Sequence, residues 1–359
     1  MESHKPHNDL PLLPPRAQIE TPDILRQTVR SARALANLRG FMTHVPNPRL
    51  LVNSIVLQEA RLSSEIESIV TTNDDLYRAV ANVDKVIDTG VKEVLGYREA
   101  VWLGFDLIKH RPLGTHIAVE MVRTLRRIEV DIRNTPGTTL TDSQDRIIYT
   151  PPQGERLIRD LLSNLETFIH DDSDGLDPLI RMAVMHYQFE AIHPFTDGNG
   201  RTGRILNVLY LVQKGLLDLP ILYLSDFILT HKSDYYRLLR DVTESGNWSE
   251  WILFMLQAVE VTANRTTDLA KSICDAMDKA SETIRKSEKH IYSRELVEIL
   301  FSNPYCKIQF LVDAGLAQRQ TAANYLKKIS ALGISKPIKI GREVYYLNHA
   351  LVQLLRHRE

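Results

Sequence analysis

The sequence has little cysteine and no long apolar run. Only Cys274 and Cys306 occur among its 359 residues, which is too few for a disulfide framework, and their spacing is not that of a zinc cluster. No stretch approaches the roughly 18 uninterrupted apolar residues of a membrane span, and Met1–Pro15 is polar and rich in proline, without an apolar signal core. We therefore expect a cytoplasmic protein with no membrane partner.

The composition is that of a folded protein. Apolar residues make up 43% and charged residues 25% of the chain, close to average soluble usage, and the length predicts two or three packed units. The net charge of −1 hides an asymmetry, because residues 285–359 carry +7 and the preceding residues −8. A basic tail of this kind suits an acidic partner such as nucleic acid, or is a solvated face.

Apolar residues recur at helical spacing over most of the chain, so the fold class is mainly α. Two helices are expected around 24–38 and 50–66, separated by Pro46 and Pro48, with Asn73-Asp74-Asp75 marking where the second stops. Further helices are predicted near 76–88, 91–108, 114–130, 153–169, 177–191, 203–214, 231–242 and 248–270, the last running on towards residue 289.

Two short β segments interrupt this pattern. Residues 134–153 contain Pro136, Gly137 and the run Arg146–Thr150, which predicts a hairpin that flanks a site. In the tail, helices near 293–302, 306–313 and 318–331 precede two alternating strands in 336–347 around a turn at Gly341-Arg342. Three helices followed by a two-stranded wing resemble a winged helix-turn-helix, with Gln318–Tyr325 opening the recognition helix.

The segment His193–Arg204, which reads HPFTDGNGRTGR, stands apart. It lies between two apolar helical segments, so we expect a loop that enters a helix N-terminus, where backbone N–H groups and the helix dipole attract anions. Gly198 and Gly200 would allow positive φ, and Arg201 and Arg204 supply two guanidinium groups suited to more than one phosphate.

Two further residues of this segment suggest chemistry. Asp197 offers a hard carboxylate beside the phosphates, as Mg²⁺ requires. His193 can accept a proton near neutral pH and so serve as a general base for a hydroxyl that attacks phosphorus. Phosphoryl or nucleotidyl transfer follows from this set. The glycines also spell G-x-G-x-x-G, but no strand precedes them, so a dinucleotide fold is not favoured.

The segment resembles the signature of the Fic (filamentation induced by cAMP) family, His-x-Phe-x-(Asp/Glu)-Gly-Asn-Gly-Arg-x-x-Arg, at every fixed position. The resemblance implies a helical Fic core with a β-hairpin flap and transfer of AMP from ATP to protein hydroxyls. It implies that His193 is the catalytic base and that Asp197 holds Mg²⁺. The nucleotide-binding positions that it implies are Gly198, Asn199, Gly200, Arg201, Thr202, Gly203 and Arg204, with Phe195 in the core beneath the loop.

The resemblance extends beyond this motif. Ile147, Ile148, Tyr149 and Thr150 look like the family's flap, which docks the target segment by strand addition. Tyr236, and with less support Tyr235, would lie against the adenine, although both could equally be core residues of an amphipathic helix.

A second motif, Ser63-Ser64-Glu65-Ile66-Glu67-Ser68, resembles the family's inhibitory helix, (Ser/Thr)-x-x-x-Glu-(Gly/Asn). By that resemblance Ser63 and Glu67 are inhibitory, and Glu67 competes with the ATP γ-phosphate for Arg204. Ser68 departs from the usual Gly or Asn, which leaves the local helix ending open. A solvated helix with this composition is the alternative.

We therefore predict a self-inhibited protein adenylyltransferase that uses ATP and Mg²⁺ and acts on Tyr, Thr or Ser of unknown proteins, with self-modification and a homodimer implied by the family. Removal of AMP by the same site and a DNA-binding regulator are the alternatives, DNA binding being the less favoured. The predicted domains are 1–110 with the inhibitory motif, a Fic core at 111–260, a linker helix at 261–290 and a winged helix at 291–359.

Overall fold

A computed structural model describes residues 3–45, 47–83, 88–141, 144–340 and 343–356. Its helices and strands, in chain order, are α1 (Pro22–His44), α2 (Pro48–Ile66), α3 (Asn73–Val80), α4 (Thr89–Leu107), α5 (Thr115–Arg126), β1 (Leu140–Thr141), β2 (Ile147–Tyr149), α6 (Glu155–His170), α7 (Pro178–Ile192), α8 (Asn199–Gln213), α9 (Leu224–Thr230), α10 (Lys232–Ser245), α11 (Trp248–Ser287), the short 3₁₀ helix η1 (Lys289–Ile291), α12 (Arg294–Ser302), β3 (Tyr305–Lys307), α13 (Ile308–Asp313), α14 (Arg319–Ala331), β4 (Lys336–Ile340), β5 (Glu343–Leu347) and α15 (His349–Arg356). The prediction of a mainly helical fold is confirmed.

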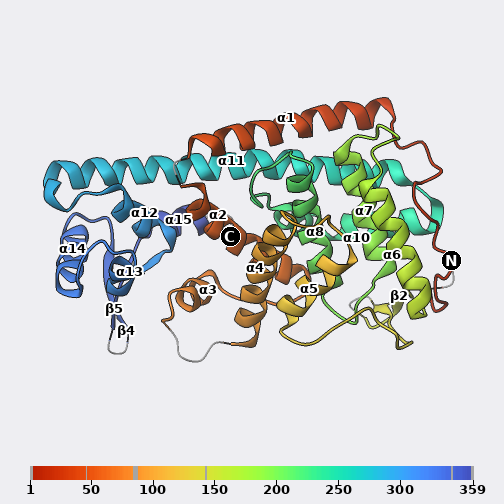
Figure 1. Ribbon diagram of the computed structural model, residues 1–359, viewed down its shortest axis with the longest axis horizontal. Coiled ribbons are helices and arrows are strands. Elements are labelled where there is room, and N and C mark those ends of the chain that lie inside the picture. The colour runs from red at the N-terminus through yellow and green to blue at the C-terminus, as the bar shows by residue number, and fades with distance from the viewer. Residues whose placement is uncertain (1–2, 46, 84–87, 142–143, 341–342, 357–359) are drawn as a thin grey trace.

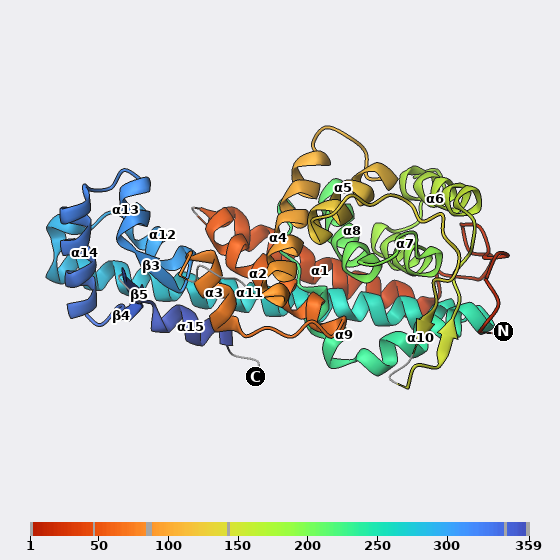
Figure 2. The same ribbon diagram turned by 90° about the horizontal axis from the view of Figure 1, so that it is seen from below.

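The 40-residue helix α11 runs along the length of the molecule, and α1 packs beside it (Figures 1 and 2). Buried Ser31 on α1 donates a hydrogen bond to the carbonyl of Leu256 on α11 (2.7 Å). At one end of α11, helices α4 to α8 and α10 form the body that carries the motif loop, and at the other end lie α12 to α15 (Figure 1). The helix thus connects the two parts.

The helices around the motif are buried on almost every side. Nearly all residues of α7 and α8 lie in the core, among them Ile192 and Leu209, which have no exposed surface. Trp251 on α11 is also fully buried, and its indole N–H donates to the carbonyl of Ala183 on α7 (2.8 Å). Because such close packing resists displacement, the loop between α7 and α8 has a rigid support.

The C-terminal part contains one strand more than the two that the sequence pattern predicts. β3, β5 and β4 form an antiparallel sheet in that order, with Tyr305 and Lys336 both paired with Leu347. β3 occupies the start of the segment predicted as a helix over 306–313, because Tyr305 and Cys306 are buried against β5. The predicted turn at Gly341-Arg342 lies outside the described residues, and the winged-helix assignment and the domain division stay predictions.

Several predicted boundaries were wrong for local reasons. Asn73-Asp74-Asp75 does not end the second helix; Thr72 caps the start of α3 by accepting from the backbone N–H of Asp75 (3.1 Å). α9 and α15 were not predicted, since each has fewer than nine residues and so shows little periodicity. The helix predicted at 203–214 begins at Asn199, because Gly198 is its N-cap residue.

Candidate active site

The loop between α7 and α8 is held in shape by its backbone conformation and by the side chain of Asn199. His193 ends α7 with φ of 51°, and Gly198 opens α8 with φ of 85°, so both have left-handed conformations. The buried side chain of Asn199 accepts from the N–H of Phe195 and donates to its carbonyl, both at 2.8 Å. Phe195 is fully buried beneath the loop, as expected. The first turn of α8 is therefore presented in one fixed orientation.

His193 lies at the end of α7, half-buried, where it lines a cavity. Burial, and to a lesser extent the cation of Arg133, lowers its pKa to about 4. Arg133 also donates through Nε to the His193 carbonyl (2.7 Å) and so anchors the backbone. Because the imidazole is neutral at pH 7, it has a free lone pair with which to accept a proton.

Gly200 and Gly203 lie where two carboxylates come close to α8, and the positive φ predicted at Gly200 was wrong. Gly200 does not have positive φ; it is part of α8, and a Cβ atom there would collide with Oε1 of Glu67. A Cβ on Gly203 would lie 2.6 Å from Oε1 of Glu190. These glycines allow carboxylates from α7 and from the end of α2 to approach α8 closely, and Thr202 between them is fully buried.

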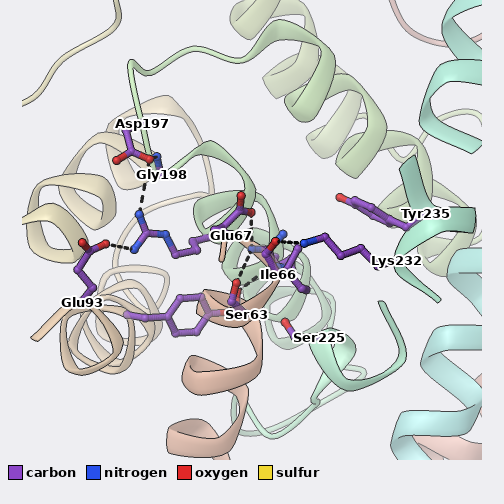
Figure 3. Close-up of polar contacts among 12 residues, drawn as sticks. Ser63, Ile66, Glu67, Glu93, Asp197, Gly198, Ser225, Lys232 and Tyr235 are labelled. Carbon is purple, nitrogen blue, oxygen red and sulfur yellow. Dashed lines mark hydrogen bonds and ion pairs between the residues drawn. The ribbon is translucent and has the colours of Figure 1, made fainter. Parts of the chain in front are cut away.

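Arg204 is buried and contacts the end of α2. Its Nε donates to Ser63 Oγ (2.8 Å), and its Nη2 donates to the Ser63 carbonyl (2.9 Å) and to Glu67 Oε1 (2.8 Å). Figure 3 shows Ser63 and Glu67 from this end of α2 at the centre of the network. The structure therefore places the two predicted inhibitory residues on Arg204, the guanidinium group that the sequence predicts to bind phosphate.

The end of α2 has the geometry that brings Glu67 to this position. Glu67 is the C-cap residue, and Ser68 follows with φ of 65°, the left-handed conformation that Gly or Asn adopts more readily. Lys232 on α10 donates through Nζ to the Ile66 carbonyl (2.6 Å), which satisfies one of the free carbonyls of the helix end. The helix therefore ends at this point even though Ser68 departs from the family pattern.

Arg201 is held by a second carboxylate, which the sequence did not reveal. Its Nη1 donates to Oε2 of Glu93 on α4 (2.7 Å), and the same oxygen accepts from Arg126 at the end of α5 (3.3 Å). Arg126 also forms an ion pair with Asp197 (2.6 Å). The contacts of Glu93 and Asp197 are visible in Figure 3. No local signal identifies Glu93 or Arg126, because both lie on helices more than 60 residues before the motif.

Glu190 is a further residue that the sequence reasoning missed. It lies one turn before His193, is half-buried, and lines the same cavity as Glu67 and His193. Burial raises its pKa to about 8, so the carboxyl group is mostly neutral at pH 7. The sequence signal that could have identified Glu190 is its position as an acidic residue one turn before His193, the predicted base.

The two candidate adenine-side tyrosines differ. Tyr236 has 36% of its surface exposed and lines the cavity. Tyr235 is buried, and its hydroxyl contacts Nε2 of His186 (2.8 Å) while its ring packs near Trp251 (5.6 Å between centroids). The prediction was therefore wrong for Tyr235, whose side chain belongs to the core because it faces α7 and α11.

The predicted hairpin forms the rim of the cavity. β1 and β2 pair with Leu140 opposite Tyr149, and residues 142–143 lie outside the described part of the chain. Ile148 and Tyr149 line the cavity, and the Tyr149 hydroxyl donates to the Ala191 carbonyl (2.8 Å). Ile147 is half-buried, whereas Thr150 lies just beyond β2 and is buried. The hairpin is thus attached directly to the helix that ends in His193.

The cavity has a volume of about 590 Å³, within the usual range of small-molecule sites. The flap, the end of α2, α7 and α10 provide its walls, and Glu67, His193 and Tyr236 line it. In the described part of the chain, no three His, Cys, Asp or Glu side chains are grouped as metal ligands. Asp197 is a single carboxylate beside the anion site, a set that suits Mg²⁺ only together with phosphate oxygens.

Comparison with known proteins agrees with this geometry. Residues 117–211 match the Fic/DOC family, residues 25–106 match the Fic/DOC family N-terminal domain, and residues 276–351 match the C-terminal domain of SoFic-like protein adenylyltransferases. The chain belongs to the Fic/DOC family. The Fic/DOC match includes the whole motif loop, and the N-terminal match includes both Glu67 and Glu93.

Curated relatives match over part of their length. The chain is 28% identical over 119 residues to protein adenylyltransferase fic-1 of Caenorhabditis briggsae, which is 33% of this chain and 22% of that protein. It is 31% identical over 114 residues to protein adenylyltransferase Fic of Nematostella vectensis, 32% of this chain and 25% of that protein. The chain thus matches about a quarter of the length of these Fic/DOC relatives.

A solved structure shares the fold over nearly the whole chain. The crystal structure of a Fic family protein from Desulfovibrio desulfuricans superposes with a TM-score of 0.59 at 18% identity and covers 93% of this chain and 98% of that one. The Fic/DOC fold, with its additional N-terminal and C-terminal helices, is therefore common to both. No helix among the described residues is long and apolar enough to cross a membrane.

Proposed function

We propose that this Fic/DOC chain is a self-inhibited protein adenylyltransferase that transfers AMP from ATP to a Tyr, Thr or Ser hydroxyl of a protein. The observation that carries the proposal is the contact of Glu67 with Arg204 at 2.8 Å, in the cavity that His193 also lines. A carboxylate that occupies the phosphate-binding guanidinium beside an intact base is the arrangement expected of a competent site held in a resting state.

In the active state, Arg201 and Arg204 bind the β- and γ-phosphates, and the N–H groups at the start of α8 stabilise phosphate charge. The flap holds the target segment so that its hydroxyl points towards His193, which accepts the proton as the oxygen attacks the α-phosphorus and pyrophosphate leaves. Asp197 would hold Mg²⁺, which neutralises phosphate charge when bound.

Glu67 prevents this state by charge and by position. The γ-phosphate and the Glu67 carboxylate both require the Nη2 side of Arg204, which also donates to Ser63. In a partly dry site two anions at one guanidinium repel each other strongly. ATP therefore binds in the productive orientation only after Glu67 leaves Arg204.

The test is label transfer from α-labelled ATP with Mg²⁺ to protein in four full-length variants. We expect weak labelling in wild type, strong labelling in Glu67→Gly, and loss of about 10²–10⁴-fold when His193→Ala is added. Glu65→Gly is the matched control, because Glu65 lies in the same helix turn but pairs with Arg61 outside the site (3.0 Å); it should label as weakly as wild type. Strong labelling that survives His193→Ala would contradict the proposal.

Removal of AMP by the same site is the second candidate. Glu67 lines the cavity with 34% of its side chain exposed, so it could orient a water molecule there. Incubation with AMP-modified protein separates the two activities: release of AMP that depends on Glu67 supports removal, and no release supports transfer alone.

We also propose that the C-terminal part is a winged helix, on the order of its elements from α12 to β5. DNA binding by this part is less favoured, because Lys328 on α14 is already paired with Glu288 (2.7 Å). Duplex binding that weakens steeply with salt would support it, and binding insensitive to salt would exclude it.

A homodimer, expected from the family resemblance, is checked by measuring the mass in solution.

A further inference from the structure

The segment before α1 lies against the flap. The flap end of the molecule and the N-terminal segment are side by side in both ribbon views (Figures 1 and 2). The backbone N–H of His7 donates to the Thr150 carbonyl (3.0 Å), and the Thr150 hydroxyl donates to the Ser3 carbonyl (2.6 Å). The His7 ring also meets Tyr149 edge to face, 6.1 Å between centroids. The segment thus contacts the chain beside β2 through both backbone and side chains.

The position of this segment is set by anchors farther along it. Leu10 and Leu13 are buried in the core, and Leu13 exchanges two hydrogen bonds with the amide of Asn164 on α6 (2.8 and 3.0 Å). The Asn8 side chain accepts from the N–H of Gln153 (2.9 Å). Ser3 therefore has a defined position, because its own carbonyl accepts from Thr150 and the chain after it is held at Asn8, Leu10 and Leu13.

Ser3 lines the cavity that also contains His193 and Glu67. Two other hydroxyl groups of the cavity lining are already engaged, because Tyr149 donates to Ala191 (2.8 Å) and Thr243 donates to Leu239 (3.0 Å). Ser68, Thr141 and Tyr236 also line the cavity. Ser3 differs from these residues because its chain segment is docked on the flap, where a target segment would lie.

We propose that Ser3 is the acceptor of a self-modification reaction, with the segment Ser3–Leu13 docked on the flap of its own chain. This inference rests on the proposed adenylyltransferase activity. Ser3 Oγ forms a bond to the α-phosphorus of ATP, the bond from that phosphorus to the pyrophosphate oxygen breaks, and the hydroxyl proton passes to His193. The products are AMP-Ser3, pyrophosphate and the protonated imidazole, which then releases its proton to water.

The experiment uses the full chain carrying Glu67→Gly, incubated with ATP and Mg²⁺, with the modified residue located by peptide mass spectrometry. We expect AMP on Ser3, at a first-order rate that does not change with protein concentration because the acceptor is in the same chain. Adding Ser3→Ala should lower self-labelling at least about tenfold, whereas Ser163→Ala, at an exposed position on α6, should leave it unchanged.

A second variant tests the docking rather than the acceptor. Thr150→Val keeps the shape of the side chain but removes the hydrogen bond to the Ser3 carbonyl, so Ser3 labelling should slow about three- to tenfold. Asn8→Ala, which removes the hydrogen bond from the Gln153 N–H and lies outside the flap, should also slow Ser3 labelling, without lowering the labelling of added lysate proteins.

The outcomes separate this inference from the proposed function. AMP found on Ser68, on Thr141 or only on added lysate proteins overturns the Ser3 assignment and leaves the adenylyltransferase activity standing. A Ser3 rate that rises in proportion to protein concentration overturns docking within one chain. No AMP on any protein, with or without lysate, overturns the activity itself and this inference with it.

Discussion

The two arginines of the motif are both neutralised by carboxylates, but in different ways. Arg204 meets Glu67 from the end of α2 and keeps two further hydrogen bonds to Ser63. Arg201 meets Glu93 from the second turn of α4, and its other acidic neighbour, Asp197, is 3.6 Å away. One partner lies at a helix end, where a small backbone change can withdraw it, and the other lies within a helix, where it cannot move independently.

This difference indicates separate purposes for the two pairs. Glu67 occupies the site that a phosphate needs and can leave without stranding Arg204. Glu93 accepts from Arg201 and Arg126 at once, so it balances buried positive charge in the fold. In the proposed function, the first pair regulates the site and the second positions Arg201 within it.

The largest effect should come from breaking the first pair. Glu67→Gln keeps the size of the side chain but removes its charge, so the γ-phosphate no longer competes with an anion. We expect label transfer from α-labelled ATP to rise about 10–100-fold, as loss of a charged hydrogen bond of about 1.5–3 kcal/mol implies. An unchanged rate together with unchanged ATP binding would show that Glu67 is not the inhibitor.

Breaking the second pair should instead affect stability. Glu93→Gln leaves the buried guanidinium of Arg201 with a single distant carboxylate, and we expect a loss of about 2–3 kcal/mol in the free energy of unfolding, measured by urea titration. Glu67→Gln is the matched control and should lose about 1 kcal/mol, because Arg204 keeps Ser63. Activation of transfer by Glu93→Gln would mean that both carboxylates are inhibitory.

The pH dependence of transfer tests whether the base is held neutral. The pKa of His193 is lowered to about 4, and Glu67 is one of the charges that raise it. In Glu67→Gln the rate should therefore fall by less than about twofold between pH 7 and 5.5, whereas a histidine with the ordinary pKa near 6.5 would lose about tenfold. An acid limb near 6.5 would show that the pKa of His193 is not lowered.

The smallest effect concerns Glu190, whose carboxyl group lies near Arg204. The pKa of Glu190 is raised to about 8 in the folded protein, so its contribution to stability is complete below about pH 4.5 and is lost as pH rises towards 8. Glu190→Gln should reduce the decline in unfolding free energy between pH 5 and pH 8, by about 1 kcal/mol or less if neighbouring charges relax. An identical decline in wild type and variant would mean that Glu190 is already ionised at pH 5.

Predictions from the sequence succeeded where a local pattern carries the chemistry. The run from His193 to Arg204 identified the loop, and apolar periodicity identified most helices. The prediction of positive φ at Gly200 was wrong, because the need for a glycine there comes from Glu67, more than 130 residues away. The sequence did not distinguish buried Tyr235 from Tyr236, which lines the cavity, because two adjacent tyrosines on one helix look alike until the helices that cover them are known.

The sequence by itself determined the family and the mainly helical fold, and it singled out His193 as the candidate base and Arg201 and Arg204 as the candidate phosphate ligands, since these depend on residue types at short fixed spacing. Only the tertiary structure decided that Glu93 accepts from both Arg201 and Arg126, that half-buried Glu190 lies near Arg204, and that the segment containing Ser3 lies on the flap. These contacts join residues far apart in the chain, and the packing of α2, α4 and α7 around α8 brings them within hydrogen-bond distance.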